Sequence, residues 1–111
     1  YDLKLTKTYK NNLYRVEIKK LDKEIYNLRG RFGMFFEYKS KNFKNIEKLI
    51  SKKIQTITYA GVKKEKILQF ILDKKLDGVD RIVPIGSALD IGLVWDGFDL
   101  IMTLSREIEV K

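Results

Sequence analysis

The stretch that decides the fold class is Gln55–Gly86, QTITYAGVKKEKILQFILDKKLDGVDRIVPIG. It opens with Gln55–Ala60, where β-branched and aromatic side chains run up to a glycine, which predicts a strand. Lys63–Lys75 follows with apolar side chains at helical spacing, which predicts an amphipathic helix ending before Gly78. The apolar face of that helix comprises Ile67, Phe70 and Ile71, and Leu68 and Leu72 widen it. Arg81–Pro84 is a short apolar run typical of a buried strand.

The flanking sequence continues the same alternation of strands and helices. An edge strand is predicted at the end of the chain, where apolar and acidic residues alternate. The further expected elements are strands at Leu13–Lys20 and Met34–Tyr38, a helix at Phe43–Ile50 capped by Asn42, and the edge strand Glu107–Val110. Strands that alternate with helices predict an α/β fold, with a partly parallel sheet flanked by helices.

Composition narrows the possible chemistry. The 111 residues include 44% hydrophobic side chains, so a core is possible and one domain is expected. No cysteine or histidine is present, which excludes thiol and imidazole catalysis and the usual zinc ligands within this stretch. No stretch is apolar enough to span a membrane, the first twenty residues do not resemble a signal peptide, and a cytoplasmic location is expected.

The net charge of +8 lies in the first half of the chain. Residues 1–54 contain 15 Lys and Arg against six Asp and Glu, whereas residues 55–111 contain eight against nine. A basic half suggests a polyanion such as nucleic acid or a phosphorylated small molecule. Because the lysines fall on predicted solvent faces without interleaved aromatics, a solvated surface explains them better, and nucleic acid is not favoured.

Two short segments stand out as candidate sites. The loop Ile85–Ile101 contains the single Trp95, and Asp96 and Asp99 could place two carboxylates on one side of a helical turn for acid–base work or a hard metal. A turn at Asp96-Gly97 and a helix cap are the commoner uses of such aspartates. In Arg31-Phe32-Gly33, an arginine beside glycines could hold an anion.

Several spaced motifs then resemble one family. They are, in order, Gln55–Thr58 (QTIT), Gly78–Gly86 (GVDRIVPIG), Trp95-Asp96-Gly97 and Leu104-Ser105-Arg106. This order resembles the carboxy-terminal end of the acyl-CoA reductases of the bioluminescence fatty-acid reductase (LuxC) family, over about Gly30 to Arg106. The chain would then be a carboxy-terminal fragment of a larger catalytic domain, similar to that of the aldehyde dehydrogenases.

The resemblance implies an oxidoreductase that reduces a fatty acyl-CoA or other acyl thioester to an aldehyde with NADPH (or NADH). The family's nucleophilic cysteine lies before the matched region, so no catalytic residue is expected in this fragment, and the fragment alone would be inactive. The resemblance also implies a homo-oligomer, for which Glu107–Val110 is a candidate contact strand. Trp95, Asp96 and Gly97 would lie near the acyl channel or a subunit interface.

The cofactor motif of the aldehyde dehydrogenases, Glu-x-Phe-Gly-Pro, is only partly matched. Phe32 and Gly33 match its Phe-Gly and are the expected cofactor-binding residues, with Phe32 as a packing contact. Gly30 stands where the glutamate would be and Met34 where the proline would be, so the ribose hydrogen bonds are in doubt. The alternative to the enzyme is a small basic nucleic-acid-binding or protein-interaction module without catalysis.

Overall fold

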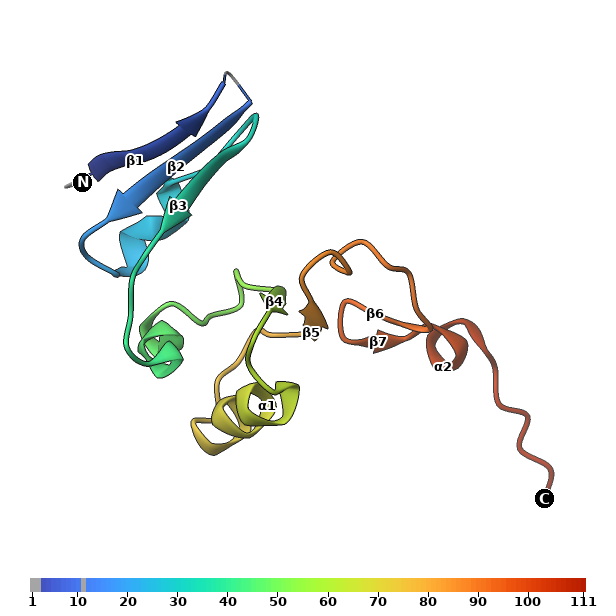
Figure 1. Ribbon diagram of the computed structural model, residues 1–111. Coiled ribbons are helices and arrows are strands. Elements are labelled where there is room, and N and C mark those ends of the chain that lie inside the picture. Colours follow the sequence, from blue (N-terminus) through green and yellow to red (C-terminus); the bar gives the residue numbers. More distant parts are fainter. Residues whose placement is uncertain (1–2, 11) are drawn as a thin grey trace. The chain divides into compact units, whose positions relative to one another are not determined.

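The structure is a computed structural model that describes residues 3–10 and 12–111 (Figure 1). It divides into two compact units, Tyr1–Leu49 and Ile50–Lys111. Together they contain small sheets and short helices, and two of the strand pairs are parallel. The mixed α/β class expected from the alternation of elements is therefore confirmed.

The first unit contains a three-stranded sheet in the order β1-β2-β3. β1 (Leu3–Tyr9) pairs with β2 (Leu13–Ile18) antiparallel, and β2 pairs with β3 (Met34–Glu37) parallel. The strands expected at Leu13–Lys20 and Met34–Tyr38 are confirmed, with slightly shorter bounds. β1 was not anticipated, although its central threonines and flanking leucines and tyrosine suit a strand.

The two faces of this sheet differ as the alternation in β2 predicts. Val16 and Ile18 are buried, and they point away from the face that carries Arg15. On that face, Arg15 donates two hydrogen bonds to Glu37, from Nε at 2.5 Å and from Nη2 at 2.8 Å. Lys39 Nζ lies 2.9 Å from Glu17 Oε2. On the solvent-exposed face of the sheet, ion pairs therefore link β2 to β3 and to the residue Lys39 that follows it.

These ion pairs shift the protonation of their members. Hydrogen bonds from Arg15, opposed by desolvation, lower the pKa of Glu37, and the same carboxylate raises the pKa of Arg15. A hydrogen bond with Lys7 lowers the pKa of Tyr9. Because the pKa of Glu37 is lowered, its pair stabilises the sheet at neutral pH. That contribution is lost as the pH falls through the lowered pKa.

Two 3₁₀-helices complete the first unit. η1 (Lys23–Asn27) begins at Asp22, whose side chain accepts a hydrogen bond from the Glu24 amide. η2 (Phe43–Lys48) begins at Asn42, whose side chain accepts from the Lys44 amide at 2.9 Å, so the predicted cap is confirmed. The element itself is shorter and more tightly wound than the helix expected over Phe43–Ile50. None of its residues is buried, so little packing supports a longer helix.

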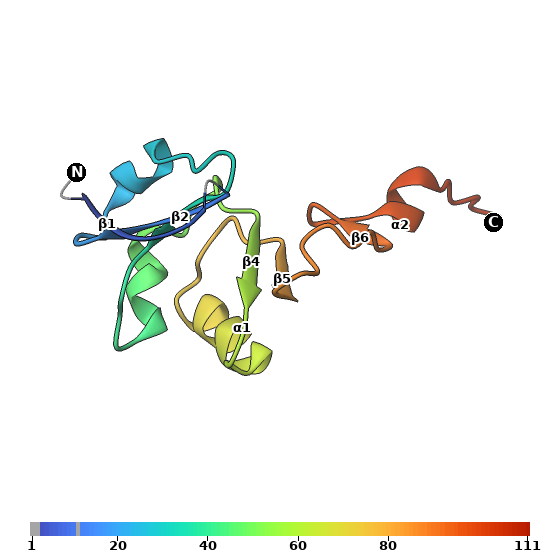
Figure 2. The ribbon, with the colours of Figure 1, turned by 45° about the horizontal axis from the view of Figure 1, so that its top comes forward.

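The second unit contains the strand–helix–strand segment predicted over residues 55–86. β4 (Thr56–Tyr59) and β5 (Arg81–Pro84) pair parallel, with α1 (Lys64–Asp73) between them in the chain (Figure 2). The predicted core face of α1 is confirmed, since Ile67, Phe70 and Ile71 are its buried residues. Leu68 and Leu72 remain exposed, so the widening of that face was wrong.

After Pro84 the structure differs from the expectation in two ways. Part of the expected loop forms regular structure, and the strand expected at the end of the chain is missing. The loop after Pro84 contains a short hairpin of β6 (Val94–Trp95) and β7 (Phe98–Asp99), followed by α2 (Leu100–Leu104). The edge strand predicted at Glu107–Val110 is wrong, because residues 105–111 form no regular structure and no strand lies in register with them. Alternation alone does not make a strand without a partner to complete the ladder.

None of the helices in the described part of the chain combines the length and apolar character that crossing a membrane requires.

Candidate functional site

Arg81, the first residue of β5, is the centre of the best-defined side-chain cluster in the second unit. Its Nη1 donates to the Ala88 carbonyl at 2.7 Å, and its Nη2 donates to the Asp90 carbonyl at 2.8 Å. Its guanidinium carbon also lies 4.8 Å from the centre of the Trp95 ring. One planar cation therefore bonds two carbonyls of the loop and stacks on the aromatic residue that follows it.

Two further contacts join the same motifs. Gln55 Nε2 donates a hydrogen bond to Asp96 Oδ1, and the Gln55 carbonyl accepts from the Asp80 amide at 2.8 Å. A Cβ placed on Gly97 would lie 3.0 Å from Asp80 Oδ1, so this glycine lies directly against the Asp80 side chain. The segments QTIT, GVDRIVPIG and Trp-Asp-Gly, which are separate in the sequence, therefore meet in the fold.

The aspartates of the loop have the structural roles that the sequence favoured. Asp96 and Gly97 both have positive φ, 51° and 79°, as the central pair of a two-residue hairpin turn requires. Asp99 caps α2, because its Oδ1 accepts a hydrogen bond from the Met102 amide at 3.1 Å. The turn and cap interpretations of these two aspartates are therefore confirmed.

The Arg81 cluster makes a direct prediction. Arg81→Ala removes two charge-assisted hydrogen bonds and the stack on Trp95, and we expect it to lower the free energy of unfolding by about 2 kcal/mol. Arg81→Lys should recover only part of this, because an ammonium cannot bond both carbonyls as a planar fork. Quenching of Trp95 fluorescence by acrylamide should rise in both variants. Arg106→Ala, at an exposed position, is the matched control and should leave quenching unchanged.

The turn Arg31–Met34 presents the two expected cofactor residues in different ways. Phe32 has φ 52° and is 94% exposed, so it is not a core residue in the described chain. Gly33 has φ 81°, and its carbonyl accepts from the Tyr14 amide at 2.9 Å. The Met34 amide closes the turn on the Arg31 carbonyl at 3.2 Å. The aromatic ring of Phe32 is therefore exposed to solvent, and Gly33 is part of the turn that holds it there.

Close backbone contacts explain why glycines stand before and within this turn. A Cβ on Gly33 would lie 2.0 Å from the Asn12 carbonyl oxygen, and one on Gly30 would lie 2.1 Å from that of Met34. No side chain fits at either position without moving the backbone. A glutamate at position 30, as in the aldehyde dehydrogenase motif, is therefore incompatible with this turn. The residues present suit ring packing against a cofactor but do not supply a carboxylate for its ribose.

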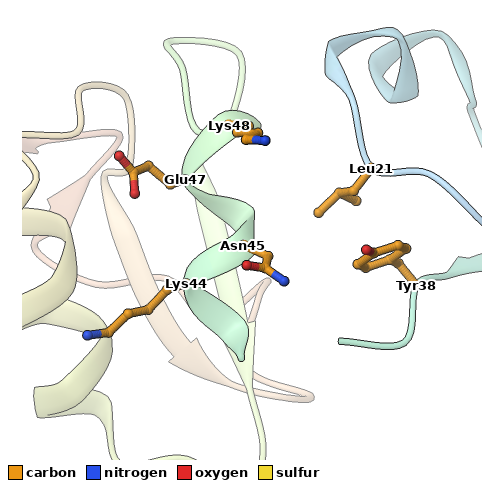
Figure 3. Close-up of a pocket in the computed structure, with 6 residues that line it drawn as sticks. All are labelled: Leu21, Tyr38, Lys44, Asn45, Glu47 and Lys48. Atoms are coloured by element: carbon orange, nitrogen blue, oxygen red, sulfur yellow. The ribbon is translucent and has the colours of Figure 1, made fainter. Parts of the chain in front are cut away.

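A hollow in the first unit has a volume of about 380 Å³ (Figure 3). It is lined by Leu21, Tyr38, Lys44, Asn45, Glu47 and Lys48. In Figure 3, Leu21 and Tyr38 face the side of η2 that carries Asn45, while Lys44 and Glu47 point away from them. The Asn45 side-chain amide donates to Ser40 Oγ at 2.7 Å, so this lining residue is held by a contact within the chain.

Among the described residues, no group of three or more acidic side chains is placed to hold a metal ion. Arg81 and Gln55 were not predicted as site residues, although both stand inside the motifs that carry the resemblance. The signal that could have found Arg81 is its place as the one cation at the start of an otherwise apolar strand. Phe32 and Trp95, both predicted, lie in separate units.

Comparison with known proteins identifies no relative: no family model matches the chain, and neither a curated protein nor a solved structure matches it significantly.

Proposed function

We propose that this chain forms the carboxy-terminal part of an acyl-CoA reductase catalytic domain, in which a fatty acyl thioester is reduced to an aldehyde with NADPH or NADH. The observation that carries the proposal is the convergence of the motif segments around Arg81. Gln55, Arg81, Trp95 and Asp96 come from three of the motifs that resemble the LuxC family. Their side chains contact in two pairs, Gln55 with Asp96 and Arg81 with Trp95. The fold therefore brings three of the motifs together in one unit.

In the proposed reaction, the residues of this chain position the cofactor and the loop around Trp95. A bound nicotinamide cofactor supplies the hydride, and the thiolate that accepts the acyl group belongs to the region before the matched motifs. Phe32, displayed on its turn, packs against the cofactor, and Gly33 holds that turn. The guanidinium of Arg81 keeps the Trp95-Asp96-Gly97 turn in place beside β5. Trp95 then contributes either to the acyl channel or to a subunit contact.

The parallel pairs support the same proposal. Parallel strands occur almost only in sheets covered on both faces, yet β4 and β5 form a sheet of two strands here. Such a pair suits a place within a larger α/β sheet, as in a dehydrogenase-like catalytic domain. A binding module built from the basic first unit has weaker support. Three of its lysines and arginines, Arg15, Lys20 and Lys39, pair with carboxylates in that unit.

The proposal is tested on the full-length gene product. Its coding sequence should extend upstream of Tyr1 and encode a cysteine nucleophile and a dinucleotide-binding domain. The purified protein should oxidise NADPH or NADH when a long-chain acyl-CoA is added, and release aldehyde in equal amount. A start codon directly before Tyr1, or a full-length protein without this activity on any acyl-CoA, would overturn the proposal.

Phe32 provides a residue-level prediction for the same enzyme. Phe32→Ala should raise the cofactor KM about tenfold, because the loss of one aromatic packing contact is about 1.4 kcal/mol. The acyl-CoA KM should change little. Phe35→Ala, which removes an exposed ring of the neighbouring strand β3, is the control and should leave both constants unchanged. Equal effects of Phe32→Ala on the two KM values would contradict a role at the cofactor.

A further inference from the structure

The turn Arg31–Met34 carries one charged side chain that has no role in the proposed function. Arg31 stands next to Phe32, whose ring is 94% exposed. The Arg31 side chain is itself exposed, and within residues 3–10 and 12–111 it forms no hydrogen bond or ion pair. A guanidinium whose donors are all free suits a group with two or more anionic oxygens, such as a phosphate.

The backbone of this turn adds further donors. Among the described residues, no acceptor bonds the amide of Phe32 or the amide of Gly33. The turn is held in place, because Gly33 lies against the Asn12 carbonyl and its own carbonyl is bonded to the Tyr14 amide. Phe32 has φ 52°, a strained value for an aromatic residue, and strain of this kind is found where a loop binds a ligand. Successive amides in a fixed turn can form an anion site.

The charge around the turn is of one sign. The turn between β1 and β2 lies beside it at the same end of the sheet (Figure 1). Residues 7–16 and 28–36, which comprise both turns and the strand residues next to them, contain five Lys and Arg and no Asp or Glu. Arg15 pairs with Glu37. In the part of the chain that the structure describes, the other four form no salt bridge: Lys7, Lys10, Arg29 and Arg31. This end of the sheet therefore attracts an anion.

Cover by the rest of a larger domain does not by itself account for these donors. An apolar segment packed over the Phe32 ring would also remove water from the Arg31 guanidinium and from the two amides. Donors that lose water without gaining an acceptor are costly, and a charged donor is the most costly of them. The occupant that fits both features combines a flat ring surface with negative charge, as a nucleotide does.

We propose that Arg31, together with the amides of Phe32 and Gly33, binds a phosphate group of the dinucleotide cofactor. The inference rests on the proposed function, in which Phe32 packs against that cofactor. It adds a charged contact at a turn where Gly30 leaves no carboxylate for the ribose. NADPH and NADH share a pyrophosphate, and NADPH carries a further phosphate on its adenosine ribose, so either group supplies the chemistry that this turn recognises.

The test is direct binding of NADPH and of NADH to the full-length protein in the absence of acyl-CoA, measured by isothermal titration calorimetry. Arg31→Ala should raise the dissociation constant for NADPH about tenfold, because charge-assisted hydrogen bonds to a phosphate are lost. The affinity should also depend less steeply on salt, since one cation no longer attracts the phosphate. Arg31→Lys should recover part of the affinity, because an ammonium binds phosphate as a point charge. The thermal midpoint should stay that of the wild type, since the side chain is exposed.

The two nucleotides identify the phosphate that is bound. A loss of affinity that Arg31→Ala causes equally for NADPH and NADH assigns the contact to the shared pyrophosphate. A loss for NADPH alone assigns it to the ribose phosphate. Either result supports the proposal.

The matched control is Lys41→Ala, which removes another exposed cation of the same unit, beyond the other end of β3. It should bind both nucleotides as the wild type does. If the wild type binds them and Arg31→Ala binds equally well, the phosphate contact is wrong while the proposed reductase stands. An equal loss from Lys41→Ala would also overturn the contact, because the net charge of the unit would then explain the affinity. A full-length protein that binds neither nucleotide would overturn both the contact and the reductase.

Discussion

Replacement of Phe70 by alanine is expected to lower the free energy of unfolding of the second unit by about 3–5 kcal/mol. Phe70 is 4% exposed, and it shares the buried face of α1 with Ile67 and Ile71. Its ring is the largest side chain in that small core, and the cavity left behind adds to the lost transfer energy. Because a unit of this size has only a few kcal/mol of net stability, we expect Phe70→Ala to be largely unfolded at 25 °C.

The measurement is urea unfolding of the 111-residue chain followed by Trp95 fluorescence, which reports on the second unit because this is the single tryptophan. Leu72→Ala is the control on the same helix. Leu72 is 60% exposed, so its truncation should cost less than about 1 kcal/mol. Equal losses in the two variants would contradict the assignment of Phe70 to the core.

Replacement of Gly33 by alanine is expected to destabilise the first unit by roughly 3 kcal/mol. Two costs add. An L-residue at φ 81° is strained, and the new Cβ would lie 2.0 Å from the Asn12 carbonyl oxygen. The turn must then move away from the β1–β2 hairpin, which breaks the hydrogen bond from the Tyr14 amide to the Gly33 carbonyl. Thermal unfolding followed by far-UV circular dichroism measures the loss.

Gly61→Ala separates these two costs. Gly61 has φ 69°, but a Cβ there would meet no atom within 4 Å. This variant should therefore lose about 1 kcal/mol, from backbone strain alone. If Gly33→Ala lowered the free energy of unfolding no more than Gly61→Ala, the close approach to Asn12 would not contribute to stability. In the reductase proposed above, Gly33→Ala should weaken cofactor binding together with stability, whereas Phe32→Ala should weaken cofactor binding alone.

Local patterns were sufficient wherever a segment bonds mainly to itself or to its immediate neighbours. The face of α1 follows from helical spacing, and the caps of Asn42 and Asp99 follow from side chains that bond amides two or three residues on. The Asp96-Gly97 turn follows from the ease with which these two residues adopt positive φ. In each case the energy that decides the structure lies within a few residues.

Local patterns gave wrong predictions where contacts with residues far along the chain determine the structure. The alternation in Glu107–Val110 is as regular as that in β2, yet β2 has strands on both sides and residues 107–110 have none. The exposure of Leu68 and Leu72 has the same cause, since in the described chain the burial of α1 reaches no further than Ile67, Phe70 and Ile71.

The residue pattern was enough to predict the α/β class and the strand–helix–strand segment, and it contains, in order, the motifs that resemble an acyl-CoA reductase. Three features become visible in the fold alone. Arg81 joins those motifs, the Phe32 ring is exposed, and the loop after Pro84 is hydrogen-bonded to Arg81 while most of its apolar side chains stay exposed. The physical reason is that periodicity and turn chemistry act over a few residues. The reach of one guanidinium to Ala88, Asp90 and Trp95 depends instead on how β4, β5 and the hairpin fold together.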